Sequence, residues 1–143
     1  MKAWTMSWLL WALLSALFAG ATAILAKVGV AGINSNLATA IRTVVVVIFT
    51  ILLATRTSSL AEVGKLTAWN WTFLALSGLA TGLSWLCYFR ALQLGPASRV
   101  APIDKLSVVF VALLGVSLLG EHLTALQWFG VGLITLGAVC MAL

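Results

Sequence analysis

Residues 90–105 read RALQLGPASRVAPIDK and interrupt an otherwise apolar sequence. This segment contains both prolines of the chain and four charged residues, Arg90, Arg99, Asp104 and Lys105. Long apolar runs with almost no charge lie on either side of it. Proline lacks the amide hydrogen that a helix interior uses, and Gly-Pro pairs are typical of turns. The segment therefore separates two hydrophobic elements, and we expect its polar residues to include functional ones.

The composition indicates the class of protein. Of the 143 residues, 63% are hydrophobic and 8% are charged, and the mean hydropathy is +1.17. Soluble domains average about 25% charged residues. Several runs approach or exceed the ~20 apolar residues that cross roughly 30 Å of hydrocarbon. The sequence therefore predicts an all-α, polytopic membrane protein.

The apolar runs predict five transmembrane helices, over approximately residues 4–26, 37–55, 73–93, 100–119 and 126–143. A helix satisfies its backbone polar groups within one segment, whereas the strands of a membrane barrel would alternate polar and apolar residues. The first run is longer than the apolar region of about 7–15 residues in a signal peptide, so we interpret it as a retained span. An odd number of spans places the N- and C-termini on opposite sides of the membrane. The chain is then a single transmembrane domain.

The distribution of basic residues does not fix the orientation of these spans. The N-terminal side carries Lys2, Arg56 and Lys65, and the other side carries Lys27 and Arg99, with Arg90 and Lys105 near the span ends. Such a balance gives the positive-inside rule no clear bias. Two interpretations remain open. Either a strong signal retains one loop in the cytoplasm, or copies insert in both orientations.

Charged residues within the expected spans are candidates for a substrate site, because a charge in the membrane is costly and usually faces a cavity. Arg42 lies about five residues into the second span, and Arg90 lies near the end of the third. Asp104 and Lys105 lie in the first turns of the fourth. Since successive spans alternate direction, these charges fall toward one membrane side. We expect a positively charged vestibule there, with Arg42 and Asp104 as a pair or as substrate contacts.

Structural explanations also exist for these charges. Lys27 and Arg99 would reach lipid headgroups with their long side chains. If the fourth helix begins with Pro102, Asp104 falls at its third position, where a carboxylate satisfies free amides and favours the helix dipole. Lys105 would point about 100° away from Asp104, which makes them poor partners.

The third expected span has two distinctive faces. One is a stripe of hydroxyl side chains at Ser77, Thr81, Ser84 and Tyr88. This stripe either lines a permeation path or bonds to a neighbouring helix. One position further on, Gly78 and Gly82 form a close-approach face that Trp85 and Phe89 continue.

Several other classes of function are not indicated. No nucleophile–base pair, paired carboxylates or metal-spaced ligands occur, so we expect no enzyme, no cofactor and no metal. The basic residues are scattered, which argues against nucleic-acid binding. Cys87 and Cys140 lie in separate apolar runs, and we expect them to be small buried residues. Glu121 and His122 are expected to be interfacial polar residues in a short hairpin.

Certain segments resemble a known family. Residues 8–27 read WLLWALLSALFAGATAILAK, residues 88–92 read YFRAL and residues 100–103 read VAPI. Residues 119–124 read LGEHLT and are followed by Gln127, Gly130 and Gly137. Together these segments resemble EamA-type members of the drug/metabolite transporter superfamily, and the last is similar to the family's LLGE-x-LT hairpin and Gly-rich final helix. The resemblance covers residues 4–143.

The resemblance implies transport of a small molecule by alternating access, commonly by ten helices in two five-helix halves of inverted topology. This chain corresponds to one half. It would therefore work as a homodimer, antiparallel if copies insert both ways, or as one half of a heteromeric transporter. The related small multidrug proteins use an acidic residue in their first helix, which this chain lacks.

We therefore predict an inner-membrane, multi-pass transporter of a small metabolite or drug-like solute. The residues expected to line the substrate path are Arg42, Thr81, Ser84, Tyr88, Arg90, Asp104 and Lys105. The excess of cationic groups favours an anionic or zwitterionic solute, and Asp104 is the plausible titratable carrier within a span. The competing interpretation is a non-transporting membrane subunit or scaffold, in which these charges only hold helices together.

Overall fold

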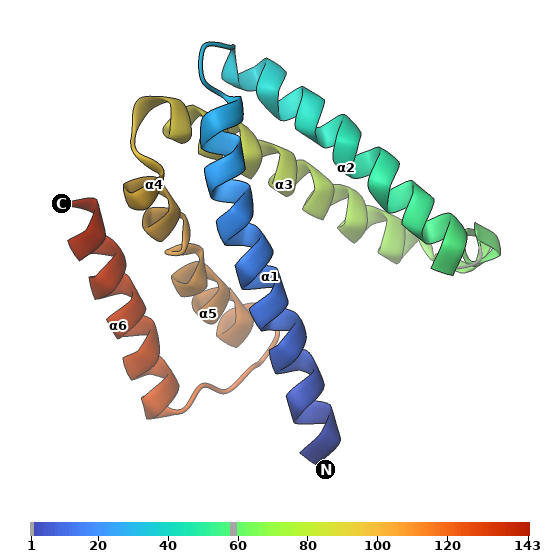
Figure 1. The fold of residues 1–143 in the computed structure, drawn as a ribbon. Coiled ribbons are helices and arrows are strands. Elements are labelled where there is room, and N and C mark those ends of the chain that lie inside the picture. The colour runs from blue at the N-terminus through green and yellow to red at the C-terminus, as the bar shows by residue number, and fades with distance from the viewer. Residues whose placement is uncertain (1, 58–59) are drawn as a thin grey trace. The chain divides into compact units, whose positions relative to one another are not determined.

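The computed structural model describes residues 2–57 and 60–143, with side chains over residues 8–56 and 62–143. The elements are α1 (Lys2–Gly29), α2 (Ser35–Thr57), the 3-10 helix η1 (Leu60–Lys65), α3 (Ala68–Leu94), α4 (Ala97–Asp104), α5 (Ser107–Leu118) and α6 (Ala125–Ala142) (Figure 1). These elements are all helical, which confirms the expected fold class. Residues 58 and 59 of the polar connector lie outside the described residues.

Five helical stretches in the described part of the chain are long and apolar enough to cross a membrane. They are Trp8–Gly29, Ser35–Arg56, Ala68–Leu94, Ala97–Leu118 and Ala125–Ala142. These stretches confirm the five expected spans. The fourth begins at Ala97, earlier than the expected residue 100, and it combines α4 with α5.

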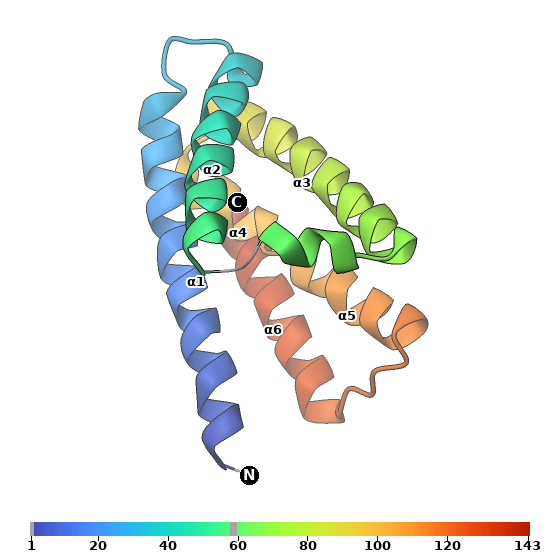
Figure 2. The same cartoon turned by 90° about the vertical axis from the view of Figure 1, so that its right-hand side faces the viewer.

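The chain divides into two compact units, which are described separately. One unit contains Met1–Val28 and Leu94–Leu143, and the other contains Gly29–Gln93. In the first unit α6 packs mainly against α4 and less extensively against α5. In the second unit α2 and α3 run in opposite directions and are connected through η1 (Figure 2).

Local sequence signals determine the turn between α5 and α6. The amides of Leu119 and Glu121 both donate to the Gly115 carbonyl, each at 3.1 Å, which closes the end of α5. This arrangement requires a left-handed residue at Gly120, whose φ is +67°. Thr124 then caps α6, because its hydroxyl accepts from the Gln127 amide while the Gln127 side chain accepts from the Thr124 amide. The expected tight hairpin is confirmed.

A side-chain cap also begins α2. The Asn34 side-chain oxygen accepts a hydrogen bond from the Asn36 amide at 2.8 Å, so Asn34 caps this helix. Gly32, with a φ of +75°, provides the left-handed turn that precedes the cap. The second span therefore begins directly after a short polar loop.

The fourth span is interrupted between α4 and α5. Four hydrogen bonds across the interruption join each amide to the carbonyl three residues earlier, beginning with Lys105 to Pro102 and ending with Val109 to Leu106. Such bonds are typical of 3-10 turns and not of an α-helix. The regular α-helical ladder is therefore broken next to Asp104, the last residue of α4.

The expected start of the fourth helix was wrong. Pro96 has an extended backbone and α4 begins directly after it, so Pro102 lies inside the helix. The Gly95–Pro96 pair is sufficient to separate this helix from α3, and the interior proline removes only one amide donor. Asp104 consequently lies at a helix C-terminus, and it cannot cap an N-terminus as the sequence suggested.

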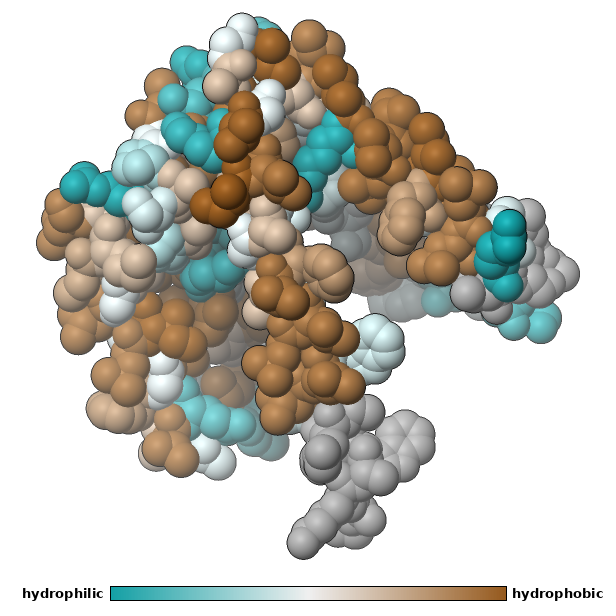
Figure 3. Space-filling model, viewed as in Figure 1, coloured by the Kyte–Doolittle hydropathy of each residue, from teal (hydrophilic) through white to brown (hydrophobic). Residues whose placement is uncertain are grey.

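The surface is dominated by apolar side chains, as expected for a protein surrounded by lipid (Figure 3). Cys87 and Cys140 are both exposed, so the expectation that they are buried was wrong. A β-carbon added at Gly78 or Gly82 would meet no described atom within 4 Å, so this part of α3 is not a close-packed face within the chain. Residues of an apolar span can face lipid as readily as a protein core. This explains why the two cysteines and the two glycines are not packed within the chain as expected.

We predict that Gly120→Ala lowers the thermal stability of the protein in detergent. A non-glycine residue in the left-handed conformation costs about 1–2 kcal/mol. No described atom crowds the Gly120 site, so the effect comes from the backbone alone. The control is Gly132→Ala, a helical position with equally open surroundings, which should keep or raise stability. Equal unfolding midpoints by circular dichroism for Gly120→Ala and wild type would contradict the prediction.

Candidate functional site

Arg42 of α2 stacks on an aromatic face of α3. Its guanidinium carbon lies 4.1 Å from the centroid of the Trp85 ring and 5.5 Å from that of Phe89. Trp85 and Phe89 are four residues apart, so they lie on one side of the helix. Arg42 and Trp85 are both half-buried. A cation over an aromatic ring gains about 0.5–2 kcal/mol, depending on how far it is desolvated.

The aromatic face belongs to the packed part of α3. Phe89 is only 3% exposed, and Leu92, one turn further on, is fully buried. The expected continuation of the α3 packing face through Trp85 and Phe89 is therefore observed, although its glycine portion is open. The packed face is the rigid partner in the contact with Arg42.

Tyr88 lies near Arg42. The two groups interact electrostatically, and Tyr88 is half-buried. Thr81 and Ser84 are exposed, and the Thr81 hydroxyl donates to the Ser77 carbonyl of its own helix at 2.9 Å. This hydroxyl therefore does not need a neighbouring helix as a hydrogen-bond acceptor.

Arg90 has a structural contact that the sequence analysis missed. Its guanidinium donates to the Gln93 side-chain oxygen at 3.0 Å, and the Gln93 amide group donates to the Ile33 carbonyl. This relay connects the end of α3 to the loop that precedes α2. The polar Gln93 at the end of an apolar span was the sequence feature that could have indicated this contact.

In the other unit, Asp104 and Lys105 form an ion pair. The Lys105 ammonium lies 3.2 Å from the Asp104 carboxylate. The expectation that they are poor partners was wrong, because it assumed a continuous α-helix, whereas the helix is broken at this point. The lysine side chain is 57% exposed and the aspartate side chain 38%, so the pair contributes little stability.

Lys27 is also engaged by the protein. Its ammonium donates to the Gly95 carbonyl at 2.8 Å, in the turn that precedes α4. The sequence predicted that this lysine reaches the lipid headgroups. The hydrogen bond instead supplies a donor to a half-buried backbone carbonyl in this turn.

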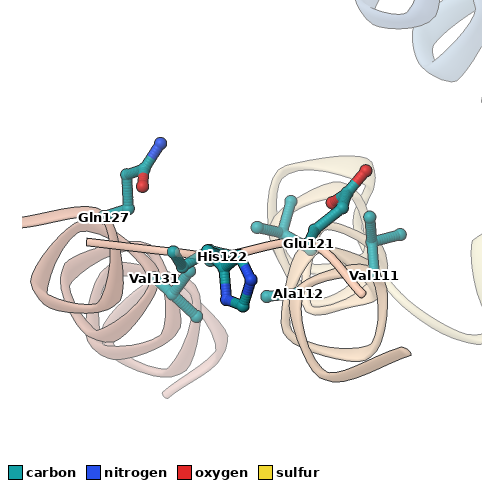
Figure 4. Close-up of a pocket in the computed structure, with 8 residues that line it drawn as sticks. Val111, Ala112, Glu121, His122, Gln127 and Val131 are labelled. Atoms are coloured by element: carbon teal, nitrogen blue, oxygen red, sulfur yellow. The ribbon is translucent and has the colours of Figure 1, made fainter. Parts of the chain in front are cut away.

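A groove of about 470 Å³ lies at the hairpin between α5 and α6. Its lining residues are Val108, Val111, Ala112, Glu121, His122, Leu123, Gln127 and Val131. His122 lies between Ala112 of α5 and Val131 of α6 (Figure 4). The Glu121 carboxylate occupies space beside Gly115, where a β-carbon would approach it to 2.7 Å. The sequence analysis identified the hairpin but not this groove.

Within the described residues, no group of three or more His, Cys, Asp or Glu side chains is placed to hold a metal ion.

We predict that Gln93→Leu loosens the loop before α2. The Ile33 carbonyl loses a donor in this variant, and such a loss costs about 1 kcal/mol. Gln93→Glu is the matched variant, because it keeps an acceptor for Arg90 but has no donor for Ile33. Both variants should speed amide hydrogen exchange over residues 30–34. Unchanged exchange in both would show that the relay does not hold this loop.

Comparison with known proteins supports the family resemblance. The EamA-like transporter family matches residues 6–143. A Sinorhizobium protein described as an uncharacterized transporter in the cobO 3' region is 55% identical over 136 residues, which cover 95% of this chain and 96% of that protein.

A Pseudomonas fluorescens protein described as a probable 4-amino-4-deoxy-L-arabinose-phosphoundecaprenol flippase subunit, ArnE, is 33% identical over 74 residues. These cover 51% of this chain and 62% of that protein. No solved structure matches. Because the family match covers nearly the whole chain and the helices include five candidate spans, this protein belongs to the EamA-like transporter family, which comprises membrane transporters and not enzymes.

Proposed function

We propose that the chain transports a small anionic or zwitterionic solute by alternating access. The observation that carries this proposal is Arg42, a half-buried cation inside the second span. The ion pairs of the described side chains are Glu62–Lys65 and Asp104–Lys105, and neither neutralises Arg42. A charge that is retained in a span without a carboxylate is expected to serve a substrate path.

The residues proposed to contact the solute form two groups, one within each unit. The α2–α3 unit contributes the side chains of Arg42, Thr81, Ser84, Tyr88 and Arg90. The other unit contributes Asp104 and Lys105 beside the interruption of the fourth span. Discontinuous helices are used in transporters because interrupted backbone groups and nearby charges can bind a solute within the membrane. The break between α4 and α5 therefore supports Asp104 and Lys105 as the second group of residues that contact the solute.

Five spans correspond to one half of a ten-helix transporter. We therefore propose that two five-span chains form the working protein. A homodimer is the simpler assembly, and it is antiparallel if copies insert in both orientations. The alternative is a heteromer with a second chain, which the description of the Pseudomonas relative as a subunit favours. The bacterial sources of both relatives support an inner membrane as the location.

We predict that Arg42→Ala and Asp104→Asn each lower solute flux in proteoliposomes by about tenfold or more. Arg42→Ala removes a charged hydrogen-bonding partner worth about 1.5–3 kcal/mol, and Asp104→Asn removes the proposed titratable carrier. The measurement uses a panel of labelled amino acids, sugar phosphates and nucleotide sugars. Lys65→Ala is the control, because Lys65 lies outside the spans in an exposed ion pair of 4.0 Å. Wild-type flux in both site variants would exclude the proposed path.

Topology reporters distinguish the two assemblies. We expect C-terminal fusions to reporters active on opposite membrane sides to give signal from both sides if the protein is an antiparallel homodimer. Copies with different affinity tags should then copurify. Signal from a single side would contradict this homodimer and would favour pairing with a second five-span chain.

A further inference from the structure

The contact between Arg42 and Trp85 leaves the hydrogen-bonding edge of the guanidinium open. An arginine side chain stacks through its flat face, whereas its five N–H donors point outward in the plane. The Arg42 side chain interacts with the Trp85 and Phe89 rings and with Tyr88. No ion pair or hydrogen bond of the described side chains occupies its donors. The stack therefore orients the cation without consuming its donors.

The aromatic partner is fixed more firmly than the arginine. Phe89 is 3% exposed and flanks the guanidinium on the same face of α3 as Trp85. The buried Leu92 continues this face by one turn. A long arginine side chain loses rotamer freedom when it binds a ligand, and prior stacking removes part of that cost. The α3 face consequently prepares Arg42 for binding.

We propose that Trp85, supported by Phe89, is a positioning residue that holds Arg42 for bidentate binding of one oxyanion, a carboxylate or phosphate group of the transported solute. Arginine forms paired, parallel hydrogen bonds to such groups, and a lysine ammonium does not. Lysine also lacks the flat face that stacks on the indole. Charge alone is therefore insufficient at residue 42. The identification of the ligand as a transported solute rests on the proposed function. The binding step itself is tested separately.

Arginine side-chain NMR tests the positioning step directly. The chain has four arginines, Arg42, Arg56, Arg90 and Arg99, so the ¹⁵N-labelled side-chain spectrum is simple and each signal is assigned by replacement with lysine. We expect the ring current of Trp85 to move the Arg42 signals upfield of the other three. Trp85→Leu should leave only the smaller displacement caused by the Phe89 ring, and Trp85→Phe should give an intermediate displacement.

Trp71→Leu is the matched control, because Trp71 is an exposed tryptophan near the other end of α3. It should leave the Arg42 signals in place. If Trp85→Leu does not fold, Trp85→Phe still tests the contact, because the smaller ring must reduce the displacement. Identical Arg42 signals in wild type and in both Trp85 variants would overturn the proposal.

Titration with inorganic phosphate and with acetate, in phosphatidylcholine nanodiscs, tests the binding step. We expect both anions to shift the Arg42 signals of the wild type. The apparent Kd should rise about 5- to 30-fold in Trp85→Leu, because an arginine that is no longer stacked must lose its rotamer freedom when it binds the anion. Arg42→Lys has no Arg42 signal, so its titration is followed through the Trp85 indole N–H signal, and it should weaken binding at least as much. Trp71→Leu should leave binding unchanged. A smaller upfield shift with unchanged affinity would overturn the positioning role.

A further titration with an anionic lipid identifies the source of the oxyanion. Nanodiscs that contain phosphatidylglycerol present the same phosphate chemistry as a headgroup. A response confined to these nanodiscs would overturn the assignment to a solute.

Flux measurements separate this inference from the transport proposal. Anion binding that depends on Trp85 in a protein without flux supports positioning and counts against transport, whereas flux that is insensitive to Trp85 counts against positioning.

Discussion

The absence of water in the bilayer is the constraint on which the whole structure depends, because every backbone polar group there needs a partner from the protein. Helices meet this requirement internally, so the positions that need explanation are their ends. Thr124 caps α6, Asn34 caps α2, and the Gly115 carbonyl accepts two amides at the end of α5. Lys27 supplies a donor to the Gly95 carbonyl in the turn before α4. Much of the polar chemistry of the chain thus serves helix ends.

The charges within the spans are accommodated in different ways. Lys105 pairs with the adjacent Asp104, a solution that depends on the break between α4 and α5. Arg90 donates to Gln93, which in turn holds the loop before α2. Arg42 is different, because its contacts are with aromatic rings and leave its donors open. Arg42 is also half-buried, and this combination makes it the basis of the proposed site.

The interruption of the fourth span links the fold to the proposed mechanism. A run of 3-10 bonds holds backbone groups less favourably than an α-helix does, so this segment is a weak point within an otherwise regular span. It carries the carboxylate of Asp104 and the ammonium of Lys105 together. Alternating access requires elements that move relative to one another, and such elements come from the less stable parts of a structure. Asp104 and Lys105, which we propose as solute-binding residues, therefore lie at this weak point of the span.

The sequence by itself determined the five spans, the hairpin at residues 120–124 and the family, because hydrophobic length and local turn chemistry act over few residues. Tertiary structure decided the contact of Arg42 with Trp85, since it depends on how α2 meets α3. The pairing of Asp104 with Lys105 depended on a break that an α-helical periodicity does not reveal. The exposure of Cys87 could not be predicted either. Lipid and protein interior are both apolar, so hydrophobicity shows that a residue is in the membrane but not which of the two it faces.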